Sequence, residues 1–154
     1  MKLELKTIKH TAWASEETHC YQASLYVDGK PVAIVSNDGR GGADRDYPHP
    51  KFKGDYRAQM RDVSRYFSGL RRTAVTEWSP EGMEQCLEFW CCDQVNDWLS
   101  ARELKKKLKA GFLFQFADKV GVFAHKTRPS RAHKATILND LPFDEALSIW
   151  KETA

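Results

Sequence analysis

The sequence predicts an α+β protein in which a small antiparallel sheet, made of N-terminal strands and a late hairpin, packs against two to four helices. Apolar and polar residues alternate on both sides of the pair Asp28-Gly29, and a second group of short aromatic runs lies between residues 112 and 125. Elsewhere, apolar residues recur at helical spacing. At 154 residues and 42% hydrophobic content the chain is large enough for a real core, so residues 1–154 are expected to form a single globular domain.

The N-terminal strands are predicted from alternation and from one turn. Residues 2–7 alternate apolar and polar, and residues 20–36 alternate again around Asp28-Gly29, a pair typical of two-residue hairpin turns. A segment with two prolines, residues 47–50, follows and is expected to be extended, because proline disfavours helical backbone in the residue before it.

Three helical regions are expected next. Residues 55–68 carry apolar side chains at helical spacing, and Gly69 is placed to end that helix. Ser79-Pro80 is a typical helix start for a core helix that reaches Leu99. Ser100 then begins a capping-box pattern, which predicts a separate helical segment up to Ala110.

The last part of the chain is expected to complete the sheet and to close on a helix. Residues 112–116 and 119–125 are predicted to pair as a hairpin that joins the N-terminal strands. The closing helix presents Phe143, Ala146, Leu147 and Trp150 on one face. It and the helix of residues 79–99 are expected to cover one face of the sheet.

Composition narrows the functional classes. The formal net charge of +3, with 29% charged residues of both signs, is mild beside that of dedicated nucleic-acid binders. No apolar run approaches the ~20 residues of a membrane span, and the N-terminus lacks a signal-peptide block, so we expect a soluble cytoplasmic protein with no membrane partner. The four cysteines lack zinc-site spacing, which predicts reduced thiols, and we expect no metal, cofactor or catalytic residue.

Residues 36–46, SNDGRGGADRD, form the strongest candidate site and are called the glycine loop below. Three glycines allow close approach to the backbone, while two arginines and three aspartates crowd the same turn. A second candidate feature is a row of arginines four residues apart on the helix of residues 55–68, which places them on one helical face. The candidate binding residues are Asn37, Asp38, Gly39, Arg40, Gly41, Gly42, Asp44, Arg45, Arg57, Arg61 and Arg65.

Several other interpretations of these features stay open. The glycine loop is explained equally by Arg40 and Arg45 pairing with its own carboxylates, and the arginine row by a solvated helix face. An anion-binding nest is conceivable, but neither the P-loop nor the dinucleotide fingerprint is present. A calcium site would need the three aspartates to converge, and nucleophilic catalysis would need Ser36 to meet His49 without any of the known sequence motifs.

The SNDGRGGADRD loop after a hairpin, together with the ending ATILNDLPFDEALSIW, resembles small uncharacterised proteins of bacteriophages and other mobile elements. The resemblance implies a protein of the bacterial host's cytoplasm that binds a host protein or nucleoprotein, with anti-defence inhibition, for example anti-CRISPR, as one such role.

Two alternatives to that function come from the residues themselves. One is direct nucleic-acid binding, helped by the basic segment of residues 126–134 and by base stacking on Tyr47, Phe52, Tyr56 or Tyr66. The other is a nucleotide- or phosphate-handling enzyme that uses the glycine loop. A homo-oligomer is a further expectation, because an N-terminal hairpin edge can pair with a copy of itself.

Overall fold

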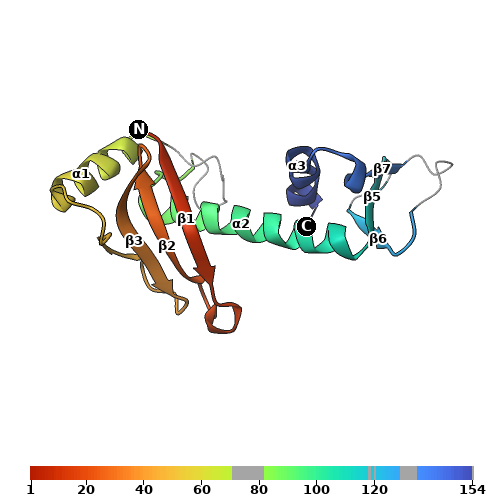
Figure 1. Cartoon of the computed structure of the whole chain (residues 1–154), viewed down its shortest axis with the longest axis horizontal. Helices are drawn as coiled ribbons and strands as arrows, with labels where there is room; N and C mark the ends of the chain where they lie inside the picture. The colour runs from red at the N-terminus through yellow and green to blue at the C-terminus, as the bar shows by residue number, and fades with distance from the viewer. Residues whose placement is uncertain (71–81, 118, 120, 129–134, 154) are drawn as a thin grey trace. The chain divides into compact units, whose positions relative to one another are not determined.

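The computed structural model describes residues 1–70, 82–117, 119, 121–128 and 135–153. It confirms the α+β class, with three α-helices and two antiparallel sheets in the described residues (Figure 1). The chain divides into two compact units, residues 1–95 and 96–154, which are treated in turn. That both units form one domain stays a prediction. No helix in the described part of the chain has the length and apolarity that crossing a bilayer requires.

The first unit is built on a four-stranded sheet of order β1-β2-β3-β4. Its strands are β1 (Leu3–His10), β2 (Cys20–Val27), β3 (Lys30–Asp38) and β4 (Arg45–Pro48). The turn between β2 and β3 is Asp28-Gly29, with φ of 47° and 80°, as the sequence predicted. One sheet face supplies most of the core, and its buried residues from β2 and β3 are Tyr21, Ala23, Leu25, Val27, Ala33 and Val35.

Strand β4 is not visible in the sequence pattern. Its four residues are all exposed, so it has no buried face and no apolar alternation. It is defined only by pairing with β3, from Ser36↔Arg45 to Ala33↔Pro48. Pro48 fits at its end because β4 is an edge strand, where a missing N–H costs no ladder bond.

Helix α1 (Tyr56–Phe67) matches the predicted helix of residues 55–68. The Asp55 side chain caps it by accepting the Ala58 N–H at 3.0 Å, and Gly69 follows with φ of 85°. Val63 and Phe67 are buried on one side of the helix. A short 3₁₀ turn, η1 (Ala12–Ala14), lies between β1 and β2.

Helix α2 (Leu87–Ala110) corrects two predictions. The predicted start at Ser79-Pro80 lies outside the described residues, but the helix begins only at Leu87, because Gly82 has φ of 76° and the Gln85 N–H bonds to the Leu70 carbonyl at 2.8 Å. The predicted break at Ser100 is also wrong: the helix runs through it without interruption.

The second unit contains a three-stranded sheet of order β6-β5-β7, so the late hairpin forms a sheet of its own. Its elements are β5 (Phe112–Phe116), β6 (Phe123–His125), β7 (Ala135–Ile137), η2 (Leu138–Asp140) and α3 (Phe143–Thr153). Strand β7, which the sequence did not predict, pairs with β5. The core of this unit consists of Leu104, Leu113, Leu138, Ala146 and Trp150.

Leu104 tests how far this small core supports the second unit. Its side chain is fully buried, and Leu104→Ala should lower the free energy of unfolding by about 2–5 kcal/mol. Lys106→Ala, on an exposed position of the same helix, is the control and should change stability by about 0.5 kcal/mol or less. Urea denaturation of both variants makes the comparison; equal stability would show that Leu104 contributes no packing.

Candidate functional site

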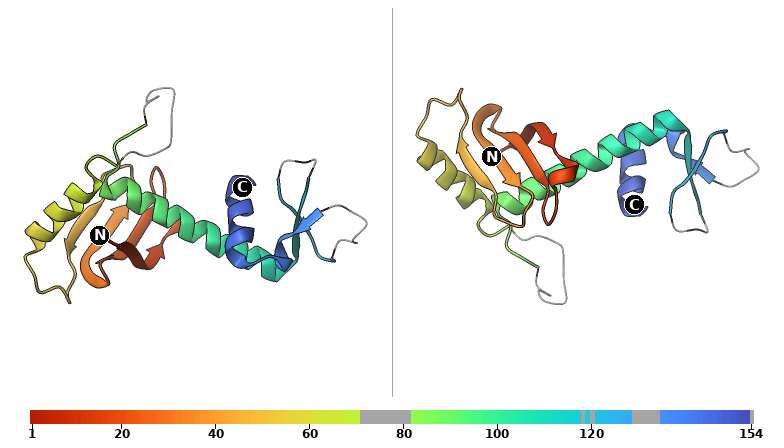
Figure 2. Two further views of the ribbon diagram at one scale, coloured as in Figure 1. Left: turned by 90° about the horizontal axis from the view of Figure 1, so that it is seen from above. Right: turned by 90° about the horizontal axis from the view of Figure 1, so that it is seen from below.

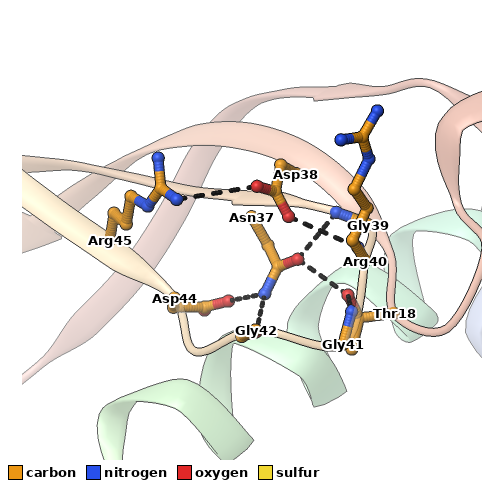
Figure 3. Close-up of polar contacts among 9 residues, drawn as sticks. All are labelled: Thr18, Asn37, Asp38, Gly39, Arg40, Gly41, Gly42, Asp44 and Arg45. Atoms are coloured by element: carbon orange, nitrogen blue, oxygen red, sulfur yellow. Dashed lines mark hydrogen bonds and ion pairs between the residues drawn. The ribbon is translucent and has the colours of Figure 1, made fainter.

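The side-chain amide of Asn37 organises the glycine loop (Figure 3). Asn37 lies near the end of β3 and is only 8% exposed. Its Oδ1 accepts the Thr18 hydroxyl at 2.7 Å and the Gly39 N–H at 2.8 Å. Its Nδ2 donates to the Gly42 carbonyl at 2.8 Å and to Asp44 Oδ1 at 2.9 Å. One buried amide therefore joins both ends of the glycine loop to the segment before β2.

The Gly39 backbone holds that segment, residues 11–19, against the glycine loop. Its carbonyl accepts the N–H groups of Glu16 and Glu17 at 2.9 Å each, and that of Thr18 at 3.3 Å. Gly39 has φ of 86°, and a Cβ on it would lie 2.0 Å from the Ala14 carbonyl oxygen. Glycine is thus required here by both conformation and space.

Three consecutive backbone N–H groups of the glycine loop are already used within the protein. The N–H groups of Gly39, Arg40 and Gly41 donate to the side chains of Asn37, Asp38 and Thr18, respectively. A phosphate would have to displace these acceptors, so the loop is not the open anion nest that nucleotide binding requires.

The three aspartates of the loop have separate partners. Asp38 pairs with Arg45 at 3.6 Å. The Asp44 carboxylate accepts the Tyr21 hydroxyl as well as Asn37, and Asp46 accepts the Tyr56 hydroxyl. Within the described residues no group of three or more His, Cys, Asp or Glu side chains is placed to hold a metal ion.

The two arginines of the loop differ in what they do. Arg45 and Asp38 are both largely exposed, so their ion pair adds little to stability. The Arg40 side chain extends away from the Asn37 network, toward solvent (Figure 3). The Asn37 amide, rather than the arginines, therefore stabilises the loop.

Trp13 is the residue that sequence reasoning missed. It lies in η1 and exposes 87% of its surface, the largest fraction among the exposed large hydrophobic residues described. Its neighbour Ala14 contacts Gly39, the neighbour of Arg40. A single tryptophan carries no periodicity, and the only signal for its exposure is its small and polar surroundings, TAWAS.

The arginine row of α1 is exposed as predicted for a helical face away from the core. Arg57, Arg61 and Arg65 are all exposed, and Arg65 pairs with Asp62 at 3.0 Å. The basic segment of residues 126–134 belongs to the other unit, and its residues 129–134 lie outside the described part of the chain.

An acidic cavity of about 740 Å³ lies within the first unit, between β3 and β4, α1 and residues 84–89. Four carboxylates line it: Asp44 just before β4, Asp46 in β4, and Glu84 and Glu88 near the start of α2. Among the described residues that line it, none is basic. Such a lining repels phosphate, which disfavours a phosphate-handling site here.

Protonated groups lie beneath the glycine loop. Burial above all, and the Asp44 carboxylate next, raise the pKa of the Cys91 thiol to about 12. Burial also raises the pKa of Tyr21, whose hydroxyl donates a hydrogen bond to Asp44. Cys91 is therefore a neutral core thiol at physiological pH and not a nucleophile. His49, the other catalytic candidate, uses its Nδ1 to accept the Lys51 N–H at 3.1 Å.

The close approach of Gly39 gives a matched pair of variants. Gly39→Ala should lower the free energy of unfolding by at least about 1–3 kcal/mol, because the methyl group meets the Ala14 carbonyl and φ is positive. Gly42→Ala should change it by about 0.5 kcal/mol or less, since its Cβ position is open. Thermal and urea unfolding measure the stability of both variants. Equal effects would contradict the clamp, that is, the close packing of Gly39 against residues 11–19.

The raised pKa of Cys91 gives a pH dependence. From pH 9 to 12 the unfolded chain releases the thiol proton while the folded chain keeps it. Stability should therefore fall as pH rises through this window, by at most about 1.4 kcal/mol per pH unit for one group. Urea midpoints between pH 8 and pH 10.5 should fall less steeply for Cys91→Ala than for the wild type. If stability falls with pH at the same rate in both proteins, burial does not raise the pKa of the Cys91 thiol.

Comparison with known proteins adds nothing to this picture: no family model matches the chain, and no curated protein or solved structure is significantly similar to it.

Proposed function

We propose that this chain is a small accessory protein of a bacteriophage or mobile element that acts, in the cytoplasm of a bacterial host, by binding a host protein or nucleoprotein. In this proposal the protein inhibits a defence system of the host, for example as an anti-CRISPR protein. The biological context is supported by the resemblance of the glycine loop and the closing segment to phage proteins. The binding function is supported by one observation, the exposure of Trp13 beside the glycine loop.

Trp13 has the properties of an interface anchor. Tryptophan and arginine are the residues most enriched among those that dominate binding energy at protein interfaces. Leaving an indole 87% exposed forfeits apolar burial in the free protein. A partner that encloses the side chain recovers that burial on binding.

The backbone around Trp13 is held in place by hydrogen bonds within the protein. The backbone of residues 11–19 is fixed by the three N–H donors on the Gly39 carbonyl, and Gly39 is fixed by Asn37. A surface that is ordered before binding loses less conformational entropy when a partner docks. Arg40 projects from the residue after Gly39, so an aromatic and a cationic side chain come from two segments in direct contact.

These features indicate the chemistry of the partner. An apolar pocket would accept the Trp13 indole, and a neighbouring carboxylate would accept the Arg40 guanidinium in a bidentate pair. Arg45 and the exposed arginines of α1, Arg57, Arg61 and Arg65, are further contacts in this proposal. The phosphate-handling alternative is disfavoured because the N–H groups of Gly39, Arg40 and Gly41 already have acceptors and the described lining of the nearby cavity is acidic.

The proposal is tested by recovery of partners from a bacterial host lysate on the tagged full chain, with and without nuclease. The variants are Trp13→Ala and Arg40→Ala, and the control is Tyr66→Ala, which removes an aromatic residue 41% exposed on α1. A host protein that survives nuclease, is lost with Trp13→Ala and is retained with Tyr66→Ala supports the proposal. Retention of every partner by Trp13→Ala would refute it.

Binding strength gives the quantitative form of the same test. With the recovered partner, Trp13→Ala should raise Kd by about 30-fold or more, the effect expected of an interface anchor worth about 2 kcal/mol. Arg40→Ala should raise Kd by a smaller factor, and neither variant should alter the unfolding midpoint, because both side chains are exposed. Calorimetric titration measures Kd, and a change of less than about threefold for Trp13→Ala would exclude it as an anchor.

A further inference from the structure

The sheet of the second unit has one face that its core does not use. In β5, Leu113 is 2% exposed and packs in the core, so the alternating residues Phe112, Phe114 and Phe116 lie on the opposite face. Phe123 of β6 pairs directly with Phe114 and therefore shares that face. These four residues are called the phenylalanine face.

The helices of this unit lie on the other side of the sheet. Figures 1 and 2 show α3 and the C-terminal part of α2 on the same side of β5, β6 and β7 in every view. The partly buried apolar residues that pack on the core are likewise separate from the phenylalanine face; they are Leu108, Val122, Leu141, Phe143, Leu147 and Ile149. Among the described elements of this unit, no helix covers the phenylalanines.

Three of the four rings, those of Phe114, Phe116 and Phe123, form one contiguous aromatic surface. Phe114 and Phe123 are stacked, with ring centroids 6.1 Å apart and an interplanar angle of 25°. Phe116 contacts both, at 5.3 Å from Phe114 and 5.7 Å from Phe123. Phe123 is 39% exposed, so the surface is accessible from solvent.

Cationic side chains border these rings. The Lys119 ammonium lies 5.2 Å from the Phe116 ring centre and 5.9 Å from that of Phe123. The Arg128 guanidinium lies 5.8 Å from the Phe112 ring centre and pairs with Asp140. Lys126, an exposed residue, directly follows β6 in the chain. The surface thus combines π faces with positive charge.

We propose that the phenylalanine face binds single-stranded nucleic acid, with bases stacked on the rings and phosphates paired with Lys119 and Lys126. Base stacking on aromatic side chains beside basic residues is the general mode of single-strand recognition. An apolar protein partner would explain the rings but not the cations around them.

The spacing of the rings favours an unpaired strand. The ring centroids of Phe114, Phe116 and Phe123 lie 5.3 to 6.1 Å apart, wider than the roughly 3.4 Å between stacked nucleotides. Each ring can therefore take a separate, splayed base. In a duplex, each base is already stacked between its neighbours, so its face cannot stack on a phenylalanine ring.

The experiment uses the full chain and 5′-labelled 12-mers of dT, of rU and of duplex DNA, with binding measured by fluorescence anisotropy. The single strands should bind, the duplex should bind at least tenfold more weakly, and the dT and rU arms distinguish DNA from RNA. Two phosphate contacts predict an affinity that falls about sevenfold between 50 and 200 mM salt, from a slope of about −0.7 per contact.

Variants assign the binding to the phenylalanine face. Phe123→Ala should weaken binding about tenfold through loss of stacking. Phe123→Leu should weaken it similarly, whereas Phe123→Tyr should restore it; these two keep the test valid if the alanine variant does not fold. Lys119→Ala should flatten the salt slope. Trp13→Ala and Tyr66→Ala, in the other unit, should have no effect, which separates this proposal from that of the Trp13 surface.

Three results would overturn the proposal: no binding of either single strand, equal binding of duplex and single strand, or wild-type affinity in Phe123→Leu. A lysate protein held by this face after nuclease, in a chain that binds no oligonucleotide, would assign the face to a protein partner instead.

Discussion

The buried amide of Asn37 is the interaction on which the candidate surface of the first unit depends. An amide can accept two hydrogen bonds and donate two, and Asn37 uses all four on different parts of the chain. An aspartate in its place would supply the acceptors but would set a second carboxylate against Asp44 without any donor. The sheet presents Asn37 opposite Tyr21, whose hydroxyl meets the same Asp44, so the core and the loop are joined at one carboxylate.

Local sequence patterns predict much of the fold. The elements that they do not predict depend on strand pairing between residues far apart in the chain. The alternation around Asp28-Gly29 and the Asp55 and Gly69 signals of α1 are local, and the structure follows them. Strand β4 is exposed at all four residues and β7 is only three residues long, so neither gives a recognisable strand pattern, and both are defined by their partners β3 and β5. A capping box indicates a helix start only if the preceding helix ends; residues 95–104 contain no glycine or proline, so α2 continues through Ser100.

The candidate sites show the same division. Composition singled out the glycines of residues 39–42 and Asn37, but it could not show that Asn37, rather than Arg40 or Arg45, holds the loop. Trp13 gave no periodic signal, and its exposure depends on how residues 11–19 fold around Gly39. The phenylalanines of β5 were recognisable as strand residues, yet the face they occupy is decided by where α2 and α3 pack.

The clamp on Gly39 has an evolutionary consequence. Residues 11–19 are held through main-chain N–H groups, and the side chains of Trp13 and Arg40 take no part in that clamp. Their identities are therefore energetically separate from the scaffold, and substitutions at these two positions leave the fold nearly unchanged. Under the proposed function, such a protein can drift toward a new target, or follow a changing one, by altering these two residues while its framework stays constant.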